Sequence, residues 1–211
     1  MKKILIGTHN KGKFGEIAHL ISNKYIKVSP LRLKIKSPRE TGKTFSSNSK
    51  IKVNFFSKFV KYPVISDDSG LCIKALENKP GIYSARLAKK KGSFSLAMKF
   101  ILKQLDKKKN RSAFFICNLS YKDTSGKVIS VEGKLNGKIS NRILGKKGFG
   151  YDPIFIPNNK KITFGQMSKH KIIKMDHRYI AFKKLKKKIK TLQIYFFRFY
   201  IYPVLVILFY L

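Results

Sequence analysis

Two adjacent carboxylates, Asp67 and Asp68, lie in the stretch SDDSGL (residues 66–71) of a strongly basic chain. The sequence has 47 lysines and arginines against 10 acidic residues, a formal net charge of +37. A carboxylate can take a proton from water, and it binds hard cations such as Mg²⁺ through oxygen. An adjacent pair also arises by chance, so the doublet alone is a weak motif and its surroundings must decide.

A second candidate site is THNKGK (residues 8–13), which follows the short β-type run KKILIG. Apolar residues then recur at helical spacing through KFGEIAHLISNKY, so we expect a strand, a polar turn and a helix N-terminus. Backbone N–H groups and the positive end of a helix dipole favour phosphate at such a place. A plain turn in which Asn10 caps the helix is the simpler explanation of this stretch taken by itself.

The elements around these residues alternate between helix and strand. We expect a helix from about Ser46 to Lys61, then YPVISDD as a buried strand that ends at the two carboxylates, with GLCIKAL as the next strand. NKPGIYSARLAKKKG resembles a loop, and SFSLAMKFILKQL an amphipathic helix capped by Ser93. SAFFICNLSY and KVISVEGKL are predicted to pair, GFGYDPIFIP to contain a short strand, and DHRYIAFKKLKKKIK to form a last helix with Asp176 at its cap. This order predicts a mixed-sheet α/β domain.

Composition limits the class of protein. A hydrophobic content of 43% indicates a globular domain despite the charge. The excess of cations suggests a polyanionic partner, but the lysines are spread evenly and form no stripe, so biased composition explains them better.

Cys72 and Cys117 lie far apart in apolar stretches without a CxxC motif, which favours buried, reduced thiols. The apolar run at the N-terminus ends at Gly7, too short for a signal peptide, so we expect a cytoplasmic protein.

The other end of the sequence is an apolar tail. It follows KKLKKKIK (183–190), contains Arg198 as its only charge, and is interrupted by Pro203. The span from 194 to 211 is at the short limit for a membrane helix. Three interpretations remain: membrane contact through residues 194–211, a segment packed on the domain or a partner subunit, or an extension without function. We divide the chain into a domain (1–190) and a hydrophobic tail (191–211).

Seven segments, taken together and in order, resemble the inosine triphosphate pyrophosphatase family. They are THNKGK (8–13), ETGKTFSSNSKIK (40–52), SDDSGL (66–71), PGIYSARLA (80–88), GFGYDPIF (148–155), TFGQM (163–167) and DHR (176–178). The resemblance covers about residues 1–190. It implies a two-lobed mixed-sheet fold with a central substrate cleft and a homodimer. It also implies hydrolysis of non-canonical purine nucleoside triphosphates (ITP, dITP, XTP) to the monophosphate and pyrophosphate.

The resemblance also implies roles for individual residues. Glu40 and Asp68 would bind Mg²⁺, and Asp68 would take the proton from the attacking water, with Asp67 helping to hold metal or water. Substrate contacts are implied for Thr8, Asn10 and Lys13 at the triphosphate, for Ser69, and for Phe149, Gly150, Tyr151, Asp152, His177 and Arg178 around the base and ribose.

Several of these residues have a second interpretation. Ser69 could be a capping hydroxyl, Phe149 a core aromatic, and Asp152 a brace for its turn, whereas the hydroxyl of Tyr151 favours a wet cleft edge. Arg178 can donate to the 6-oxo group of hypoxanthine or xanthine, and the amino group of adenine would leave those donors unpaired.

Three positions depart from the family pattern. Asp176 stands where the family has Ser, Ser49 where it commonly has Ala, and Ile172 where a substrate-contacting Lys is expected. The alternative function is nucleic-acid binding by a basic protein on a related scaffold. The sequence has no stripe of basic residues interleaved with aromatics, so we expect no specific nucleic-acid partner.

Overall fold

One mixed sheet forms the body of the molecule in the computed structural model, which describes the backbone of residues 2–200 and the side chains of residues 2–190. The strands are β1 (Lys2–Ile6), β2 (Tyr25–Val28), β3 (Val64–Ile73), β4 (Lys79–Pro80), β5 (Ser112–Lys122), β6 (Val128–Ile139) and β7 (Phe155–Pro157). Their order is β2-β1-β3-β5-β6-β7, with β4 beside β3. β1 runs parallel to β2 and β3, and the remaining pairs are antiparallel. The predicted mixed-sheet α/β class is confirmed.

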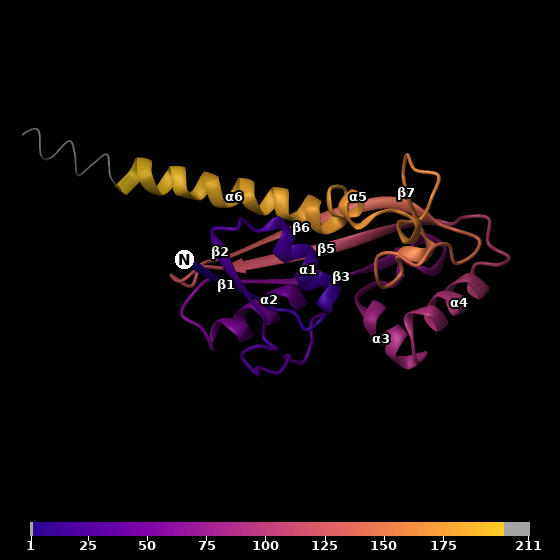
Figure 1. The fold of residues 1–211 in the computed structure, drawn as a ribbon, viewed down its shortest axis with the longest axis horizontal. Helices are drawn as coiled ribbons and strands as arrows, with labels where there is room; N and C mark the ends of the chain where they lie inside the picture. The colour runs from indigo at the N-terminus through magenta and orange to yellow at the C-terminus, as the bar shows by residue number, and fades with distance from the viewer. Residues whose placement is uncertain (1, 201–211) are drawn as a thin grey trace, which may run out of the picture.

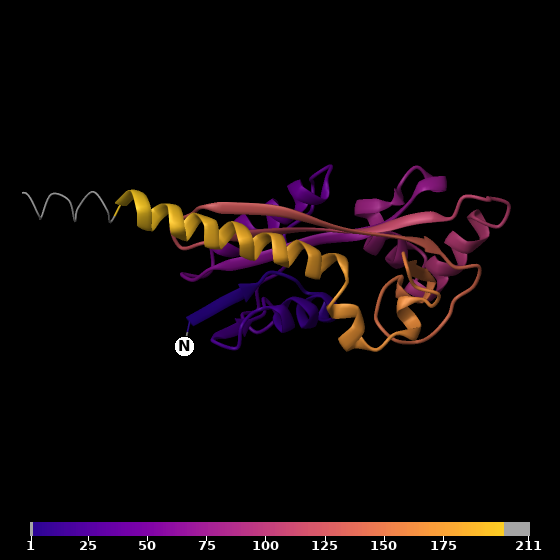
Figure 2. The ribbon, with the colours of Figure 1, turned by 90° about the horizontal axis from the view of Figure 1, so that it is seen from above.

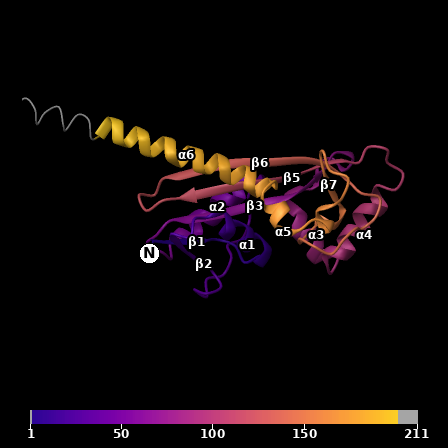
Figure 3. The ribbon, with the colours of Figure 1, turned by 45° about the horizontal axis from the view of Figure 1, so that its top comes forward.

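The helices divide over two lobes joined by the long strands β5 and β6 (Figure 1). One lobe holds β1, β2 and the first two helices, and the other holds β7 and the next three. The last helix runs along the sheet, beside β6 and β5, as the turned views show (Figures 2 and 3). These helices are α1 (Lys11–Leu20), α2 (Phe45–Ser57), α3 (Ser84–Lys90), α4 (Phe94–Gln104), α5 (Lys169–Ile173) and α6 (His177–Tyr200).

Side-chain alternation along β3 and β5 builds separate layers on the two faces of the sheet. Ile65 and Leu119 pack with α1 and α6, and Phe115 packs with α4 on the same face. Val64, one residue away from Ile65, packs with α2 on the opposite face. Neighbouring residues of one strand therefore meet different helices.

Several local predictions are confirmed by cap contacts. The Asn10 side chain accepts from the Lys13 N–H at 3.0 Å, and Ser93 accepts from the Leu96 N–H at 3.1 Å. Asp176 accepts from the Tyr179 N–H at 2.6 Å at the start of α6. Cys72 and Cys117 are buried and free.

The structure corrects the prediction for the doublet's own strand. β3 runs without a break from Val64 to Ile73, so Asp67 and Asp68 lie in its middle and GLCIKAL does not begin a new strand. The cause is tertiary, because every residue of β3 pairs with β5. The loop predicted for NKPGIYSARLAKKKG is also wrong, because this stretch contains β4 and α3. β2 and α5 were not predicted.

The predicted membrane contact falls largely outside the described residues, since 201–211 are not among them. Within residues 2–200, no helix has the length and apolar character needed to cross a bilayer. The division into a domain and a tail stays a prediction.

Helix α6 reaches the sheet through Gly133 of β6. A Cβ at this position would overlap the His177 carbonyl and the Ala181 backbone nitrogen, neither of which can rotate away. We therefore expect Gly133→Ala to push the start of α6 off the sheet, to lower the free energy of unfolding by about 1–3 kcal/mol, and to reduce activity. Gly15→Ala is the matched control, because a Cβ there meets only the Lys169 ammonium at 3.7 Å. Urea unfolding of both variants tests this, and equal stability of the two would contradict it.

Candidate active site

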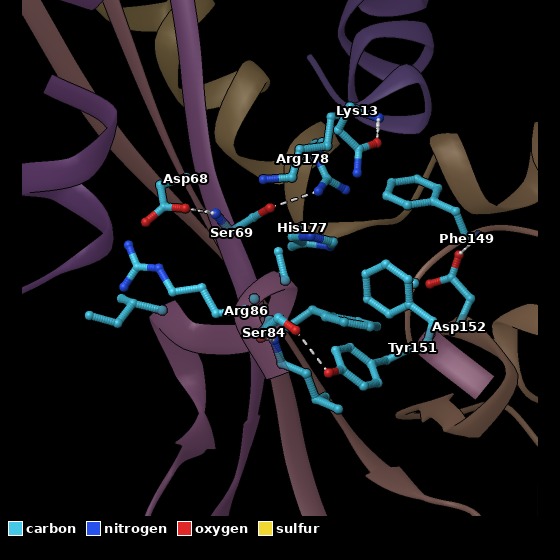
Figure 4. Close-up of a pocket in the computed structure, with 18 of the residues that line it drawn as sticks. Lys13, Asp68, Ser69, Ser84, Arg86, Phe149, Tyr151, Asp152, His177 and Arg178 are labelled. Carbon is cyan, nitrogen blue, oxygen red and sulfur yellow. Dashed lines mark hydrogen bonds between the residues drawn. The ribbon is translucent and has the colours of Figure 1, made fainter. Parts of the chain in front are cut away.

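The SDDSGL stretch forms an open edge of β3 between the two lobes. β1 pairs with β3 only at Val64 and Ile65, and β4 pairs only at Cys72 and Ile73. Residues 66–71 therefore have no strand neighbour on that side, while β5 holds the other. A cavity opens at this edge, and the predicted site residues line it, all except Thr8 and Asp67 (Figure 4).

The two carboxylates of the doublet point to opposite faces of the sheet, as side chains of adjacent strand residues must. Asp67, fully buried, faces α1 and α6, where its Oδ2 lies 3.2 Å from the Lys13 ammonium and 3.4 Å from the Arg178 Nε. The Ser69 hydroxyl donates to the same oxygen at 3.0 Å. Asp67 is thus the anion that holds Lys13, Arg178 and Ser69 together behind the cleft.

Asp68 faces α2 and lines the cleft. Its Oδ2 accepts from the Asn48 amide at 3.0 Å, and its Oδ1 accepts from the Ser69 N–H at 3.0 Å. The Lys52 ammonium lies 3.8 Å from Oδ1 and 2.8 Å from Glu40 Oε1. The Arg86 guanidinium donates to the Glu40 carbonyl at 2.9 Å. Glu40 and Asp68 therefore both lie within ion-pair distance of one buried ammonium group.

Environment separates the pKa values of the two carboxyls. Burial alone would raise the pKa of Asp67, but Lys13, Arg178 and Lys52 outweigh it and hold that pKa well below its usual range. Burial raises the pKa of Asp68 above its usual value, and Lys52 and Lys13 only partly offset the rise. Asp67 is a permanent anion and Asp68 is the better proton acceptor.

The donor set fits a Mg²⁺ ion that arrives with phosphates. Within the described residues no cluster of three or more His, Cys, Asp or Glu could bind a metal by itself. Mg²⁺ in phosphate sites is commonly held by one or two carboxylates together with substrate oxygens and waters. The pair Glu40 and Asp68 meets that requirement, and the Lys52 ammonium between them shows that the space already favours a cation.

The turn before α1 places a helix N-terminus and the Lys13 side chain together, and both favour an anion. Thr8 is buried and its hydroxyl accepts from the Asn10 N–H at 3.2 Å, so it shapes the turn rather than lining the cleft. Asn10 caps α1 and lines the cavity. Lys13, in the first turn of α1, also lines the cavity, and its ammonium pairs with Asp67. The helix N-terminus and one lysine therefore face the same space as Asp68.

The other lobe supplies aromatic walls through the turn at 148–152. Phe149 is half-buried, with the Arg178 guanidinium 5.3 Å from its ring centre, so its ring lies at the cleft. Gly150 has φ +66°, a value that favours glycine, and the Asp152 carboxylate accepts from the Phe149 N–H at 2.8 Å. Asp152 therefore braces the turn. Burial raises the pKa of Asp152 to about 7.

Tyr151 differs from its prediction. It is only 3% exposed, and its hydroxyl donates to the Ser84 carbonyl at 2.9 Å instead of lying at a wet edge. Its ring packs edge to face on the Phe94 ring, with the ring centres 5.2 Å apart, and forms part of the cavity wall.

His177 and Arg178 meet the cleft from the start of α6. The His177 ring stacks on Phe115 with centres 4.9 Å apart, and burial together with the Arg178 charge lowers its pKa well below its usual value. Its Nδ1 is buried without a hydrogen-bond partner among the described residues. Arg178 donates to Glu16 at 2.8 Å and to the Ser69 hydroxyl at 2.7 Å, besides Asp67. A neutral imidazole with a free nitrogen and a clamped guanidinium thus border the same cavity.

Four contributors were not predicted from the sequence as site residues: Glu16, Asn48, Lys52 and Arg86. Asn48, Lys52 and Arg86 lie inside two of the seven segments that resemble the family. A polar residue on an apolar helix face, or beside a motif, was the feature of the sequence that could have identified them. Glu16 offered none, because its partner Arg178 lies 162 residues away.

The departures at 172 and 176 are both buried, and neither side chain lines the cavity. Ile172 is 3% exposed and packs in the apolar core of the second lobe, so it presents no polar group to the cleft. Asp176 is also buried, and burial together with the charge of Glu16 raises its pKa, which the charge of Arg178 only partly offsets.

Comparison with known proteins agrees with this geometry. The model of the Ham1 family matches residues 4–188. The chain belongs to the Ham1 family. A protein named dITP/XTP pyrophosphatase from Caulobacter vibrioides is 38% identical over 186 residues, which cover 87% of this chain and 96% of the relative. One with the same name from Borrelia duttonii is 40% identical over 196 residues, with 89% and 96% covered.

Solved structures support the same assignment. The structure of the Staphylococcus aureus Ham1 protein superposes with a TM-score of 0.80 at 31% identity, covering 90% of this chain and 99% of that one. A HAM1 protein from Coxiella burnetii gives 0.81 at 28% identity, with 90% and 100% covered. The resemblance drawn from seven short segments is therefore confirmed, together with the two-lobed fold.

Asp176 provides a test of the buried charge cluster. Its pKa is raised in the folded state, so between its usual and its raised value the folded chain keeps a proton that the unfolded chain has lost. Wild-type stability therefore falls as pH rises through this window, by up to about 1.4 kcal/mol per pH unit. Asp176→Asn keeps an oxygen for the Tyr179 N–H but has no proton to lose. Its stability relative to wild type should increase between about pH 5 and about pH 8, measured by urea unfolding. A constant difference would show that folded Asp176 is ionised.

Proposed function

We propose that this chain hydrolyses dITP, ITP and XTP to the monophosphate and pyrophosphate and so removes non-canonical purine nucleotides from the cellular pool. One observation carries the proposal: a single cavity joins a carboxylate pair and a helix N-terminus at one end to an aromatic ring and a buried, unpartnered imidazole at the other. The relatives named dITP/XTP pyrophosphatase support it over the nucleic-acid-binding alternative.

The phosphate end would work by positioning and charge. Asn10, Lys13 and the α1 N-terminus would hold the triphosphate, with Thr8 shaping the turn. Glu40 and Asp68 would hold Mg²⁺, which when bound supplies charge neutralisation and Lewis acidity. Asp68 accepts the proton of the water that attacks the α-phosphorus. The bond from the α-phosphorus to the oxygen that bridges it to the β-phosphorus breaks, and pyrophosphate leaves.

Asp67 has a supporting role that differs from its expected one. It lies behind the cleft and keeps Lys13 and Arg178 in place, whereas holding metal or water was expected of it. Ser69 would donate or accept at the substrate from its position between Asp67 and Arg178.

The base end would select 6-oxopurines. Phe149 would stack on the purine, with Gly150, Tyr151 and Asp152 fixing the wall and the turn. The remaining N–H groups of Arg178 and the free Nδ1 of His177 would meet the base edge. Because these groups are buried, a base that leaves them unpaired is disfavoured.

We further propose a homodimer that acts in the cytoplasm. The family resemblance supports the homodimer. The free, buried thiols of Cys72 and Cys117 support the cytoplasmic location. Light scattering of the purified full chain tests the homodimer, and a monomer would remove it.

The deciding assay is pyrophosphate release by the full chain across dITP, XTP, ITP and ATP, with and without Mg²⁺. We expect release from dITP to exceed release from ATP by at least about 100-fold in kcat/KM, because the buried donors go unpaired with adenine. Equal rates for dITP and ATP would overturn the specificity, and an undiminished rate in EDTA would overturn the role of Mg²⁺.

Asp68→Asn should lower kcat for dITP by about 10²–10⁴-fold, because an amide accepts no proton. Steady-state kinetics at saturating Mg²⁺ measures this. Asp106→Asn, a substitution of the same type outside the cleft on an exposed residue, is the matched control and should leave kcat unchanged. An Asp68→Asn enzyme with wild-type kcat would exclude Asp68 as the base.

A further inference from the structure

Asn48 makes one hydrogen bond to the Asp68 carboxylate and one to the backbone of the segment that carries Glu40. It lies on α2 and is fully buried. Its side-chain nitrogen donates to Asp68 Oδ2 at 3.0 Å, and its side-chain oxygen accepts from the Gly42 N–H at 2.8 Å. Gly42 is two residues from Glu40 on the chain. One amide therefore spans from β3 to the segment that carries Glu40.

The Glu40 segment needs such support. Residues 29–44 contain no helix or strand, so no regular ladder fixes the Glu40 backbone. At its far side the segment is held by His9, whose ring nitrogens contact the Ile35 carbonyl at 2.9 Å and the Ser37 hydroxyl at 2.6 Å. Nearer Glu40, the Asn48–Gly42 hydrogen bond ties the backbone to α2.

The contacts of the Glu40 carboxylate would change when a divalent cation arrives, whereas the Arg86 hydrogen bond to the Glu40 backbone carbonyl does not involve that carboxylate. Its carboxylate is paired with Lys52 and Arg86, both positively charged. A Mg²⁺ ion between Glu40 and Asp68 would take the place that the Lys52 ammonium now holds, because two cations repel each other there. The amide of Asn48 carries no charge, so a cation between Glu40 and Asp68 would not displace it by charge repulsion.

We propose that Asn48 is a positioning residue that sets the separation of Asp68 and Glu40 and so prepares the site for Mg²⁺ with the triphosphate. The inference rests on the proposed function, since it concerns the same carboxylate pair. Residues that orient metal ligands from behind typically contribute about 10–100-fold to metal affinity or activity.

The experiment compares Asn48→Leu, which keeps the number of side-chain heavy atoms and the branch at Cγ and removes both hydrogen bonds, with Asn54→Leu. Asn54 lies on the same helix and is exposed. Among the described residues, its side-chain oxygen accepts only from the Lys122 ammonium, at 3.1 Å. The probe is α,β-imido-dITP, whose cleavable bridge is blocked. Calorimetry on the full chain gives the Kd of this analogue in EDTA and in saturating Mg²⁺, and the ratio of the two is the Mg²⁺ gain.

We expect Asn48→Leu to reduce the Mg²⁺ gain by at least about tenfold, with the Kd in EDTA within about twofold of wild type. Asn54→Leu should keep the wild-type gain. A merely structural role of Asn48 would weaken binding equally with and without Mg²⁺, and that result would overturn the proposal, as would an undiminished gain. If Asn48→Leu fails to fold, Asn48→Ala removes the same amide without an apolar branch against Asp68, and the same loss is expected.

The outcomes separate this inference from the proposed function. A wild-type chain that releases pyrophosphate from dITP while Asn48→Leu keeps its full Mg²⁺ gain overturns only the role of Asn48. A wild-type chain whose affinity for the analogue is independent of Mg²⁺ overturns the metal pair and the role of Asn48 together.

Discussion

The alternation of side chains along β3 is the constraint on which the rest of the site depends. Adjacent residues of a strand face opposite sides of a sheet, so Asp67 and Asp68 meet different layers although they are neighbours in sequence. Buried charges require partners. The α1 and α6 layer supplies Lys13 and Arg178 for Asp67, and the α2 layer supplies Lys52 and Asn48 for Asp68. A doublet that looks like one site is in effect the meeting point of two.

The open edge of β3 converts this division into a cleft. Because β1 stops pairing at Ile65 and β4 begins only at Cys72, groups from both faces reach the same space around the intervening residues. The long pair β5 and β6 passes through both lobes. β5 also carries Phe115, one of the aromatic residues that line the cavity. The close contact at Gly133 then places the first turn of α6, and with it His177 and Arg178, against the sheet.

The sequence predicted what is local and missed what is tertiary. Caps at Asn10, Ser93 and Asp176 depend on residues within one turn, and all three are present. The unbroken β3 depends on pairing with β5, about fifty residues later in the chain, and a Ser-Gly pair inside a strand looks like a turn when that pairing is unknown.

Burial and long-range partners were equally hidden from the sequence. Nothing local indicates that the Tyr151 hydroxyl meets the Ser84 carbonyl, or that Glu16 pairs with Arg178. Most of the site could still be listed in advance, because the family resemblance supplied residues whose three-dimensional partners local patterns do not show.

The distribution of acids gives the large net charge a different meaning. Six of the ten acidic residues line the cleft or lie directly behind it: Glu16, Glu40, Asp67, Asp68, Asp152 and Asp176. A composition that has nearly eliminated acids elsewhere retains them where each has a buried partner or a proposed ligand. The lysines spread over the surface form a separate feature, whose summed field would draw a polyanionic triphosphate toward the molecule. Four of these acids, Glu16, Glu40, Asp67 and Asp68, are paired locally with Lys13, Lys52, Arg86 and Arg178. The surface charge can therefore change with composition while these ion pairs inside the site stay the same.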